Sequence, residues 1–174
     1  MPIVFDMKKI NSYKADSPYP ELGEVEKNTK WTELLKEAYA GKCSELTSVT
    51  QYIYHHFNME RGFPEISECL FYISIVEMHH LEIIGGLIKK LGGDPTYSSS
   101  VNKNKNWSSK NVAYLKNIEG ILSRSIMDEK TSVTVYKDII KQIENEDIKG
   151  LLKRIVLDEI VHIDRLTELY RKYV

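Results

Sequence analysis

Residues 73–80 read ISIVEMHH and residues 155–162 read IVLDEIVH, and these two stretches are the strongest indication of the fold in the sequence. In each, a glutamate is followed three residues later by a histidine, within a series of apolar residues spaced by three and four positions. Such spacing places all of them on one face of a helix, the face that is buried when helices pack together. A carboxylate on that face is costly unless it is paired, protonated or bound to a cation. The two stretches therefore predict two helices that direct Glu77, His80, Glu159 and His162 into a shared core.

A further apolar stripe precedes each of these helices and carries one more glutamate. The first stripe contains Glu45 and Tyr52, and the second contains Glu129 and Tyr136 at the same spacing. The chain thus uses one helix pair twice, a repeat too long and too few in number for a solenoid. The predicted fold class is all-α, a four-helix bundle.

Length and composition agree with one globular domain. The chain has 174 residues, of which 42% are apolar and 28% charged, and its formal net charge is −1. The balanced and scattered charge gives no basic face for nucleic acid, so no nucleic-acid partner is expected. No apolar signal region and no run of about 18 apolar residues is found, so we expect a cytoplasmic protein without a membrane span. Cys43 and Cys69 lack the C-x-x-C spacing of a zinc ribbon.

Turn residues divide the chain into an arm and a bundle. Residues 1–28 are irregular and rich in proline and aromatic residues, and they predict an extended N-terminal arm; residues 29–174 form the bundle. The middle connection over 92–110 spans up to about 60 Å, more than a helix of roughly 45 Å, so a long crossover is permitted. Helix is predicted over about 29–61 with a break near Gly41, 64–91, 110–143 and 146–174.

The loop lengths bring the four glutamates to one level of the bundle. Each lies about 13 to 16 residues from a tight turn, so their heights differ by only about 3 to 5 Å at the rise of an α-helix. Four carboxylates and two imidazoles in one layer suit a pair of iron or manganese ions better than a tetrahedral zinc site, which takes fewer ligands. The sequence therefore predicts a two-metal site built from six residues: Glu45, Glu77, His80, Glu129, Glu159 and His162.

Three segments resemble helices of the ferritin-like superfamily, in particular those of bacterioferritin and rubrerythrin. They are SELTSVTQYIYHHF at 44–57, IVEMHHLE at 75–82 and LDEIVHIDRL at 157–166, and the resemblance covers about residues 29–172. It implies a ferritin-like four-helix bundle with a dinuclear centre, which agrees with the arrangement that ferritin-like carboxylate proteins share. By this resemblance Glu77 and Glu159 bridge the metals, Glu45 and His80 complete one position, and Glu129 and His162 complete the other.

The same resemblance implies roles for residues around the ligands. Tyr52 and Tyr136 would donate hydrogen bonds to ligands, and Asp158 would orient a ligand histidine, namely His80. Val76 stands at the place that corresponds to Asp158 in the other half of the chain, so the second metal position lacks this support and the two positions are expected to differ in affinity.

We favour an enzyme, although the same six residues also serve other functions. The leading hypothesis is a rubrerythrin-like oxidoreductase with iron, acting on peroxide, dioxygen or ferrous iron. The chain has no four-cysteine rubredoxin module, so electrons would come from an external donor. One alternative is a manganese catalase, with which the YPE motif at 19–21 and the long arm share a weak similarity. The other is a metal-stapled structural or coat-type protein without turnover.

Two further expectations concern assembly and haem. Apolar residues on the outer side of the second predicted helix, Phe71, Tyr72 and Ile75, suggest a second buried face, and we expect a homodimer. Met78 stands beside Glu77 as the haem-ligating methionine does in bacterioferritin, but a lone methionine on a helix is more often a packing residue and haem is not expected.

Overall fold

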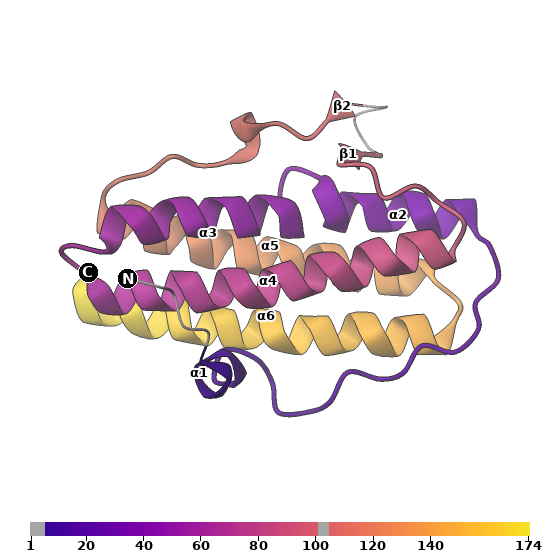
Figure 1. The fold of residues 1–174 in the computed structure, drawn as a ribbon, viewed down its shortest axis with the longest axis horizontal. Helices are drawn as coiled ribbons and strands as arrows, with labels where there is room; N and C mark the ends of the chain where they lie inside the picture. Colours follow the sequence, from indigo (N-terminus) through magenta and orange to yellow (C-terminus); the bar gives the residue numbers. More distant parts are fainter. Residues whose placement is uncertain (1–5, 101–104) are drawn as a thin grey trace.

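The computed structural model describes residues 6–100 and 105–174, which form an elongated helical bundle (Figure 1). Residues 1–5 of the predicted arm and 101–104 of the predicted middle connection lie outside the described part. The elements follow in the order α1 (Met7–Asn11), α2 (Thr29–Ala40), α3 (Glu45–Met59), α4 (Pro64–Lys90), β1 (Ser98–Ser99), β2 (Lys105–Asn106), the 3-10 turn η1 (Ser109–Asn111), α5 (Ile118–Gln142) and α6 (Glu146–Tyr173).

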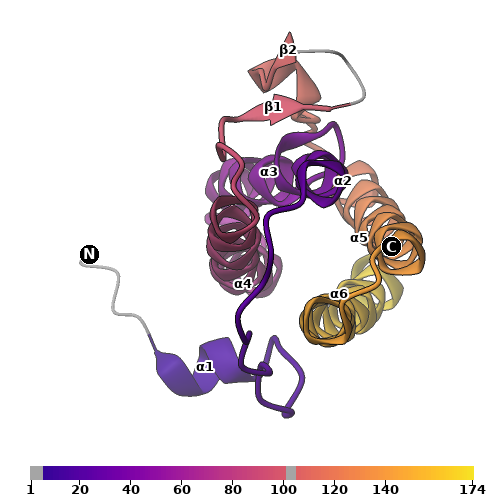
Figure 2. The same cartoon turned by 90° about the vertical axis from the view of Figure 1, so that its right-hand side faces the viewer.

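Helices α3 to α6 are the four helices of the bundle (Figure 2), and α2 lies beyond the start of α3 along the same side of the bundle (Figure 1). Helix α3 packs chiefly against α4, and α5 against α6, as two antiparallel hairpins. The connection between the pairs returns along the outside of the bundle from the end of α4 to the opposite end, where α5 begins (Figure 1). The all-α bundle with a long middle crossover and an extended N-terminal arm, predicted from the sequence, is confirmed.

Local sequence fixes where the bundle helices begin. The side chains of Ser44, Asn117 and Asn145 each accept a hydrogen bond from a backbone N–H in the first turn of α3, α5 and α6. These caps satisfy backbone donors that have no partner within the helix. Pro64 opens α4, where its fixed backbone angle suits a first helical position.

Helices α2 and α3 are separated by a break at residues 41–44, as the sequence predicted near Gly41. The Ser44 hydroxyl donates to the Gly41 carbonyl at 2.9 Å and so closes the turn. The middle connection covers the break, since the Trp107 indole N–H donates to the Thr47 hydroxyl at 2.9 Å. The break makes Glu45 the first residue of α3.

Helix α5 begins at Ile118, so the prediction that helix resumes near residue 110 is wrong. Residues before it are held against α3 instead. The Ala113 backbone N–H donates to the Gln51 side chain at 2.8 Å, and the Ala113 carbonyl lies 2.7 Å from His55 Nε2. These contacts use backbone groups that a helix would need, and the Asn117 cap then starts α5.

The N-terminal arm carries a short helix, α1, which the sequence pattern did not predict. After α1 the arm lies beside α4 and α6, where Tyr19 contacts His79 and Arg154, and it continues to the start of α2 (Figure 2). Tyr13 stacks on Tyr72 with ring centroids 5.6 Å apart. The outer side of α4, predicted as a dimer face, is therefore partly covered by the chain's own arm, and the homodimer stays a prediction.

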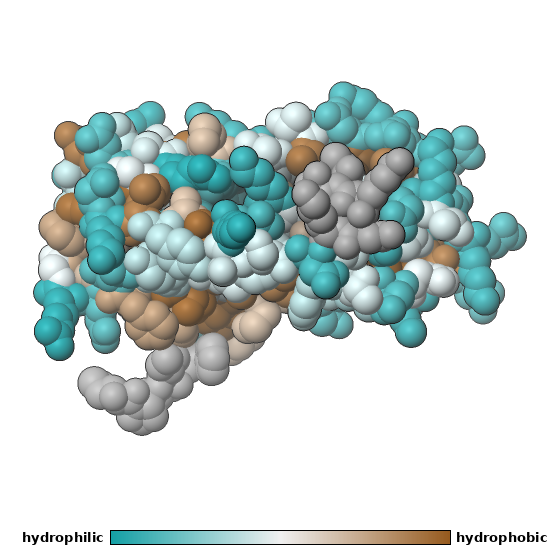
Figure 3. Space-filling view, turned by 90° about the horizontal axis from the view of Figure 1, so that it is seen from above, coloured by the Kyte–Doolittle hydropathy of each residue, from teal (hydrophilic) through white to brown (hydrophobic). Residues whose placement is uncertain are grey.

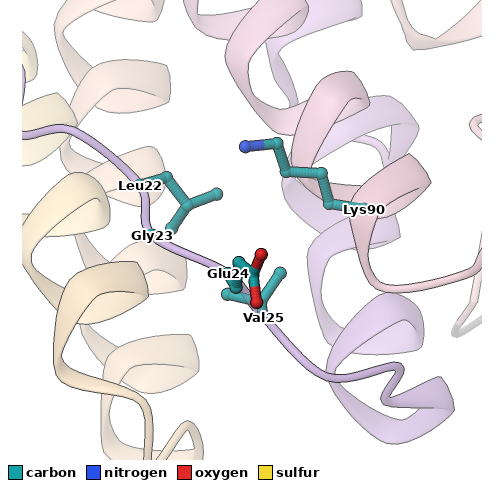
Figure 4. A pocket seen from close by; sticks show the side chains of 5 residues that line it. All are labelled: Leu22, Gly23, Glu24, Val25 and Lys90. Carbon is teal, nitrogen blue, oxygen red and sulfur yellow. The ribbon is translucent and has the colours of Figure 1, made fainter.

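Close to α2 the arm borders an open hollow of about 580 Å³. Leu22, Gly23, Glu24 and Val25 lie on one side of it, and Lys90 extends from the end of α4 on the other (Figure 4). None of these residues belongs to the predicted metal site, so the hollow is a surface feature of the arm's path.

The core consists of two apolar clusters on either side of a polar layer. One contains Leu35, Ile84, Leu152 and Ile155, and the other contains Leu70, Ile73, Leu122 and Leu166 among others, with every one of these side chains fully buried. On α4 and α6 the residues between the clusters are the Glu-x-x-His segments. The layer is thus closed off from water along the bundle axis.

The surface on the side of the middle connection is mainly hydrophilic, and its apolar residues gather along one long edge (Figure 3). Helix α4 is long and apolar enough to meet the length and composition criteria for a membrane span, a test that the core helix of a soluble bundle also passes. Here Ile66, Leu70, Ile73 and Ile84 of this helix are fully buried in the bundle.

Candidate metal centre

The structure brings all six sequence-predicted ligands together at mid-bundle. Each bundle helix contributes: α3 carries Glu45, α5 carries Glu129, and α4 and α6 each carry one Glu-x-x-His segment. Every one of the six side chains is at most 2% exposed. The matching heights that loop lengths predicted are therefore found.

The six residues form two overlapping groups of four. In each group, one ligand atom from every residue lies within 4.8 Å of the others. Glu77 and Glu159 belong to both groups, as a pair of bridging carboxylates would. The remaining members divide by sequence half, with Glu45 and His80 in one group and Glu129 and His162 in the other.

Both histidines direct Nδ1 at the carboxylates. His80 Nδ1 lies 3.2 Å from Glu159, 3.5 Å from Glu45 and 3.6 Å from Glu77. His162 Nδ1 lies 2.9 Å from Glu77, 3.6 Å from Glu129 and 3.7 Å from Glu159. The two imidazole rings are 6.1 Å apart, with the shared glutamates between them.

In the part of the chain that the structure describes, many carboxylate oxygens and histidine nitrogens in the layer have no hydrogen-bond partner, and they are placed to bind cations. Among the described residues, buried atoms without a hydrogen-bond partner include Oε2 of Glu45, Oε1 of Glu77, Oε2 of Glu129, both carboxylate oxygens of Glu159 and Nδ1 of both histidines. Buried polar atoms are rarely left in this state. Carboxylate oxygens and imidazole nitrogens are ligands that iron and manganese accept, so the donor set fits two such ions.

Burial and charge shift the pKa of every group in the layer. Burial raises the pKa of Glu45 and Glu129 well above the usual range, and the neighbouring Glu77 carboxylate adds to both shifts. Burial alone would lower the pKa of His80 and His162, but contacts with surrounding carboxylates raise both well above the usual value. In the absence of cations the layer therefore retains protons, and metal binding would displace them.

Two tyrosines hold glutamates of the opposite helix pair. The Tyr52 hydroxyl on α3 donates to Glu129 Oε1 on α5, and the Tyr136 hydroxyl on α5 donates to Glu45 Oε1 on α3. Each hydrogen bond leaves the other oxygen of that glutamate directed at the layer. Both tyrosines thus contact glutamates of the predicted site, as the resemblance implied, and do so across the bundle.

The two histidines differ in what lies behind them. His80 Nε2 is 3.1 Å from Asp158 Oδ2, the contact that the resemblance implied. His162 Nε2 is buried and has no hydrogen-bond partner among the residues described. Val76, at the place corresponding to Asp158, offers none. The two halves of the layer are therefore unequal.

Sequence reasoning missed the residues that hold Asp158 in place. Arg154 Nη1 donates to Asp158 Oδ1 at 2.5 Å, and the Tyr19 hydroxyl of the arm donates to Oδ2. The Arg154 contact had a signal in the sequence, because charged residues four apart on a helix are neighbours. The Tyr19 contact had none, since nothing in an irregular arm shows where it packs.

The fold is a helical bundle whose core holds a layer of six carboxylate and imidazole side chains that could bind metal ions. The chain belongs to the ferritin-like family, whose domain model matches residues 21–173. The recognition made from three sequence segments is therefore confirmed. A comparison with curated proteins by sequence found no significant match.

Solved structures with similar folds include catalases and bacterioferritins. A manganese catalase from Anabaena superposes with a TM-score of 0.81 at 23% identity, covering 91% of this chain and 78% of that one. A bacterioferritin from Rhodobacter capsulatus gives 0.71 at 24% identity, covering 86% and 88%. A bacterioferritin from Desulfovibrio desulfuricans, described with a diiron site, gives 0.68 at 21% identity, covering 94% and 82%. At these identities the similarity shows the fold.

Proposed function

We propose that the protein is a di-metal carboxylate oxidoreductase that acts on hydrogen peroxide, with iron as the favoured metal. The observation that carries the proposal is the pair of buried four-residue groups sharing Glu77 and Glu159. Six ionisable side chains in an apolar core are costly without cations to balance them. Two ions held between shared carboxylates supply two electrons together, which is the number that peroxide reduction needs.

The chain's own residues would bind, orient and shield the centre. Glu77 and Glu159 would span both positions, while Glu45 with His80 and Glu129 with His162 would complete one each. Tyr52 and Tyr136 would keep the outer glutamates oriented. The apolar clusters on both sides would exclude water, so the site would admit small molecules such as peroxide or dioxygen.

In this proposal the electrons come from a donor outside the bundle. Peroxide reduction follows H₂O₂ + 2 e⁻ + 2 H⁺ → 2 H₂O, and the bundle itself carries only two cysteines, Cys43 and Cys69, too few for a four-cysteine centre. A separate reduced protein or small donor would therefore be the second substrate. Oxidation of ferrous iron is the related reaction, in which iron itself is the donor.

A manganese catalase is the second candidate, and the fold comparison favours it. The Anabaena manganese catalase gives a higher TM-score than either bacterioferritin, 0.81 against 0.71 and 0.68. A catalase would need no donor, because 2 H₂O₂ → O₂ + 2 H₂O balances without added electrons. Release of oxygen is therefore the measurement that separates the two candidates.

The experiment is a peroxide assay on full-length protein loaded with iron or with manganese. We expect peroxide loss with the iron form that depends on an added reductant and yields no oxygen. Oxygen release from the manganese form without reductant would select the catalase instead. Glu77→Ala and His162→Ala should abolish either activity.

A matched control separates loss of the site from loss of a surface charge. Glu168→Ala removes a glutamate on the exposed side of α6, where its side chain is 73% accessible, and should leave activity unchanged. If loaded protein shows no turnover with either metal, yet loses stability when the metal is removed, the metal-stapled structural role is correct.

A further inference from the structure

Asp158 is enclosed by hydrogen-bond donors, and part of the enclosure comes from the N-terminal arm. The side chain is fully buried on α6. Within the described part of the chain its carboxylate contacts four groups: the Ala15 backbone N–H at 2.7 Å, the Tyr19 hydroxyl, Arg154 Nη1 at 2.5 Å and His80 Nε2 at 3.1 Å. A carboxylate has about four acceptor positions, so this set saturates it and fixes its orientation.

The arm also fixes the arginine that contacts Asp158. Arg154 Nε donates to the Ser17 carbonyl at 2.5 Å, and its Nη2 donates to the Ala15 carbonyl at 2.7 Å. The guanidinium group of Arg154 lies over the Tyr19 ring, with Cζ 4.3 Å from the ring centroid. Arg154 is only 4% exposed, so a buried charge is stabilised by backbone and ring of the arm.

The hydrogen bonds around Asp158 affect only one half of the layer. Asp158 orients His80, because a histidine whose second ring N–H donates to a carboxylate is held in one tautomer and binds metal more strongly. His162 has no such partner among the described residues. The arm is therefore joined to the Glu45–His80 position and not to the Glu129–His162 position.

We propose that the N-terminal arm is a working part of the metal centre, in which Tyr19 and Arg154 hold Asp158 so that His80 binds its ion tightly. The proposal rests on the proposed function only in requiring a two-ion site. Tyr19 and Arg154 are positioning residues, since neither belongs to the groups that would bind the ions.

The test is Mn²⁺ binding by full-length protein, measured from the electron paramagnetic resonance signal of free Mn²⁺. Tyr19→Phe removes the hydroxyl and keeps the ring over Arg154. Wild-type protein should bind two ions, and Tyr19→Phe should weaken one of them by about tenfold while the other changes less than about twofold. The matched control is Tyr13→Phe, which removes an arm hydroxyl that does not contact Asp158, and both affinities should stay at the wild-type value.

Two backgrounds identify which ion is affected. His162→Ala leaves the Glu45–His80 position, and there Tyr19→Phe should again weaken the remaining ion by about tenfold. His80→Ala removes the group that Asp158 orients, and there Tyr19→Phe should have no effect on the remaining ion. An equal effect in both backgrounds overturns the proposal, because the hydroxyl would then act without His80.

Thermal melting of the metal-free variants separates positioning from a structural role. If Tyr19→Phe lowers the melting temperature and weakens both ions together, the arm only stabilises the bundle and the proposal is wrong. If wild-type protein binds two ions and Tyr19→Phe binds both with unchanged affinity, the proposal is also overturned. The two-metal site itself would then be supported. Absence of Mn²⁺ and Fe²⁺ binding by wild-type protein overturns both the arm's role and the proposed function.

Discussion

The hydroxyl of Tyr52 donates to Glu129, so a residue of one helix pair orients a glutamate of the other. Both side chains are fully or almost fully buried. Tyr52→Phe would leave Glu129 Oε1 without this donor, and an unsatisfied buried acceptor costs about 1–3 kcal/mol. We expect the free energy of unfolding of metal-free protein to fall by that amount, as measured by urea denaturation.

The control for this variant is Tyr114→Phe, which removes a hydroxyl from a ring that is 53% exposed. Its effect should stay within about 0.5 kcal/mol, as for most surface substitutions. Equal stability losses in the two variants would show that the Tyr52 hydroxyl contributes nothing specific.

Metal should raise the melting temperature in proportion to the logarithm of its concentration. A ligand present at 100 times its dissociation constant stabilises the folded state by about 2.7 kcal/mol, which corresponds to roughly 5–11 °C for a chain of this size. We expect this shift with Mn²⁺ or Fe²⁺ and its reversal with a chelator. Glu77→Gln combined with Glu159→Gln removes both shared carboxylates and should abolish the shift; a shift that persists would place the ions elsewhere.

Gly41 and Gly86 should respond in opposite directions to substitution by alanine. A Cβ at Gly41 would lie 2.4 Å from the Glu37 carbonyl oxygen, so Gly41→Ala must displace backbone at the α2–α3 break and should cost about 1–3 kcal/mol. A Cβ at Gly86 meets no atom within 4 Å, and Gly86→Ala in helix α4 should stabilise by about 1 kcal/mol. Chemical denaturation of both variants measures the difference, and a shared sign would contradict the local geometry.

Stability should fall at high pH because of Cys69. Burial raises the pKa of its thiol to about 12. An unfolded thiol ionises near pH 8.5, so between that pH and 12 the unfolded state loses a proton that the folded state keeps, and folding weakens by about 2 kcal/mol between pH 8 and pH 10. In urea denaturation, the free energy of unfolding of Cys69→Ala should fall by about 2 kcal/mol less than that of the wild type between pH 8 and pH 10. Parallel pH profiles for the two proteins would refute the assignment.

The sequence predicted the polar layer because its residues sit on regular helical stripes. Glu45 and Glu129 reach the level of the two Glu-x-x-His segments through helix geometry and loop length, and both are physical constraints that a sequence carries directly. The structure brings the six side chains together, and their role as metal ligands stays a prediction.

The contacts that escaped prediction involve segments without periodicity. The hydrogen bond from Tyr19 to Asp158 joins residues 139 positions apart, and an irregular arm gives no register that would predict it. The start of α5 was misplaced because the contacts of Ala113 with Gln51 and His55 are tertiary, and they hold as irregular structure a segment that local pattern assigned to helix.

The pairing of the arm with α6 also sets an order of events during synthesis. Tyr19 leaves the ribosome long before Asp158, its partner 139 residues later. Tyr19 must therefore wait for α6 before it gains this hydrogen bond, whereas Tyr13 of the arm can already stack on Tyr72 of α4. A nascent chain that ends before α6 lacks Asp158 and two of the six residues of the polar layer, Glu159 and His162, so the Glu45–His80 position is completed only after α6 has been made.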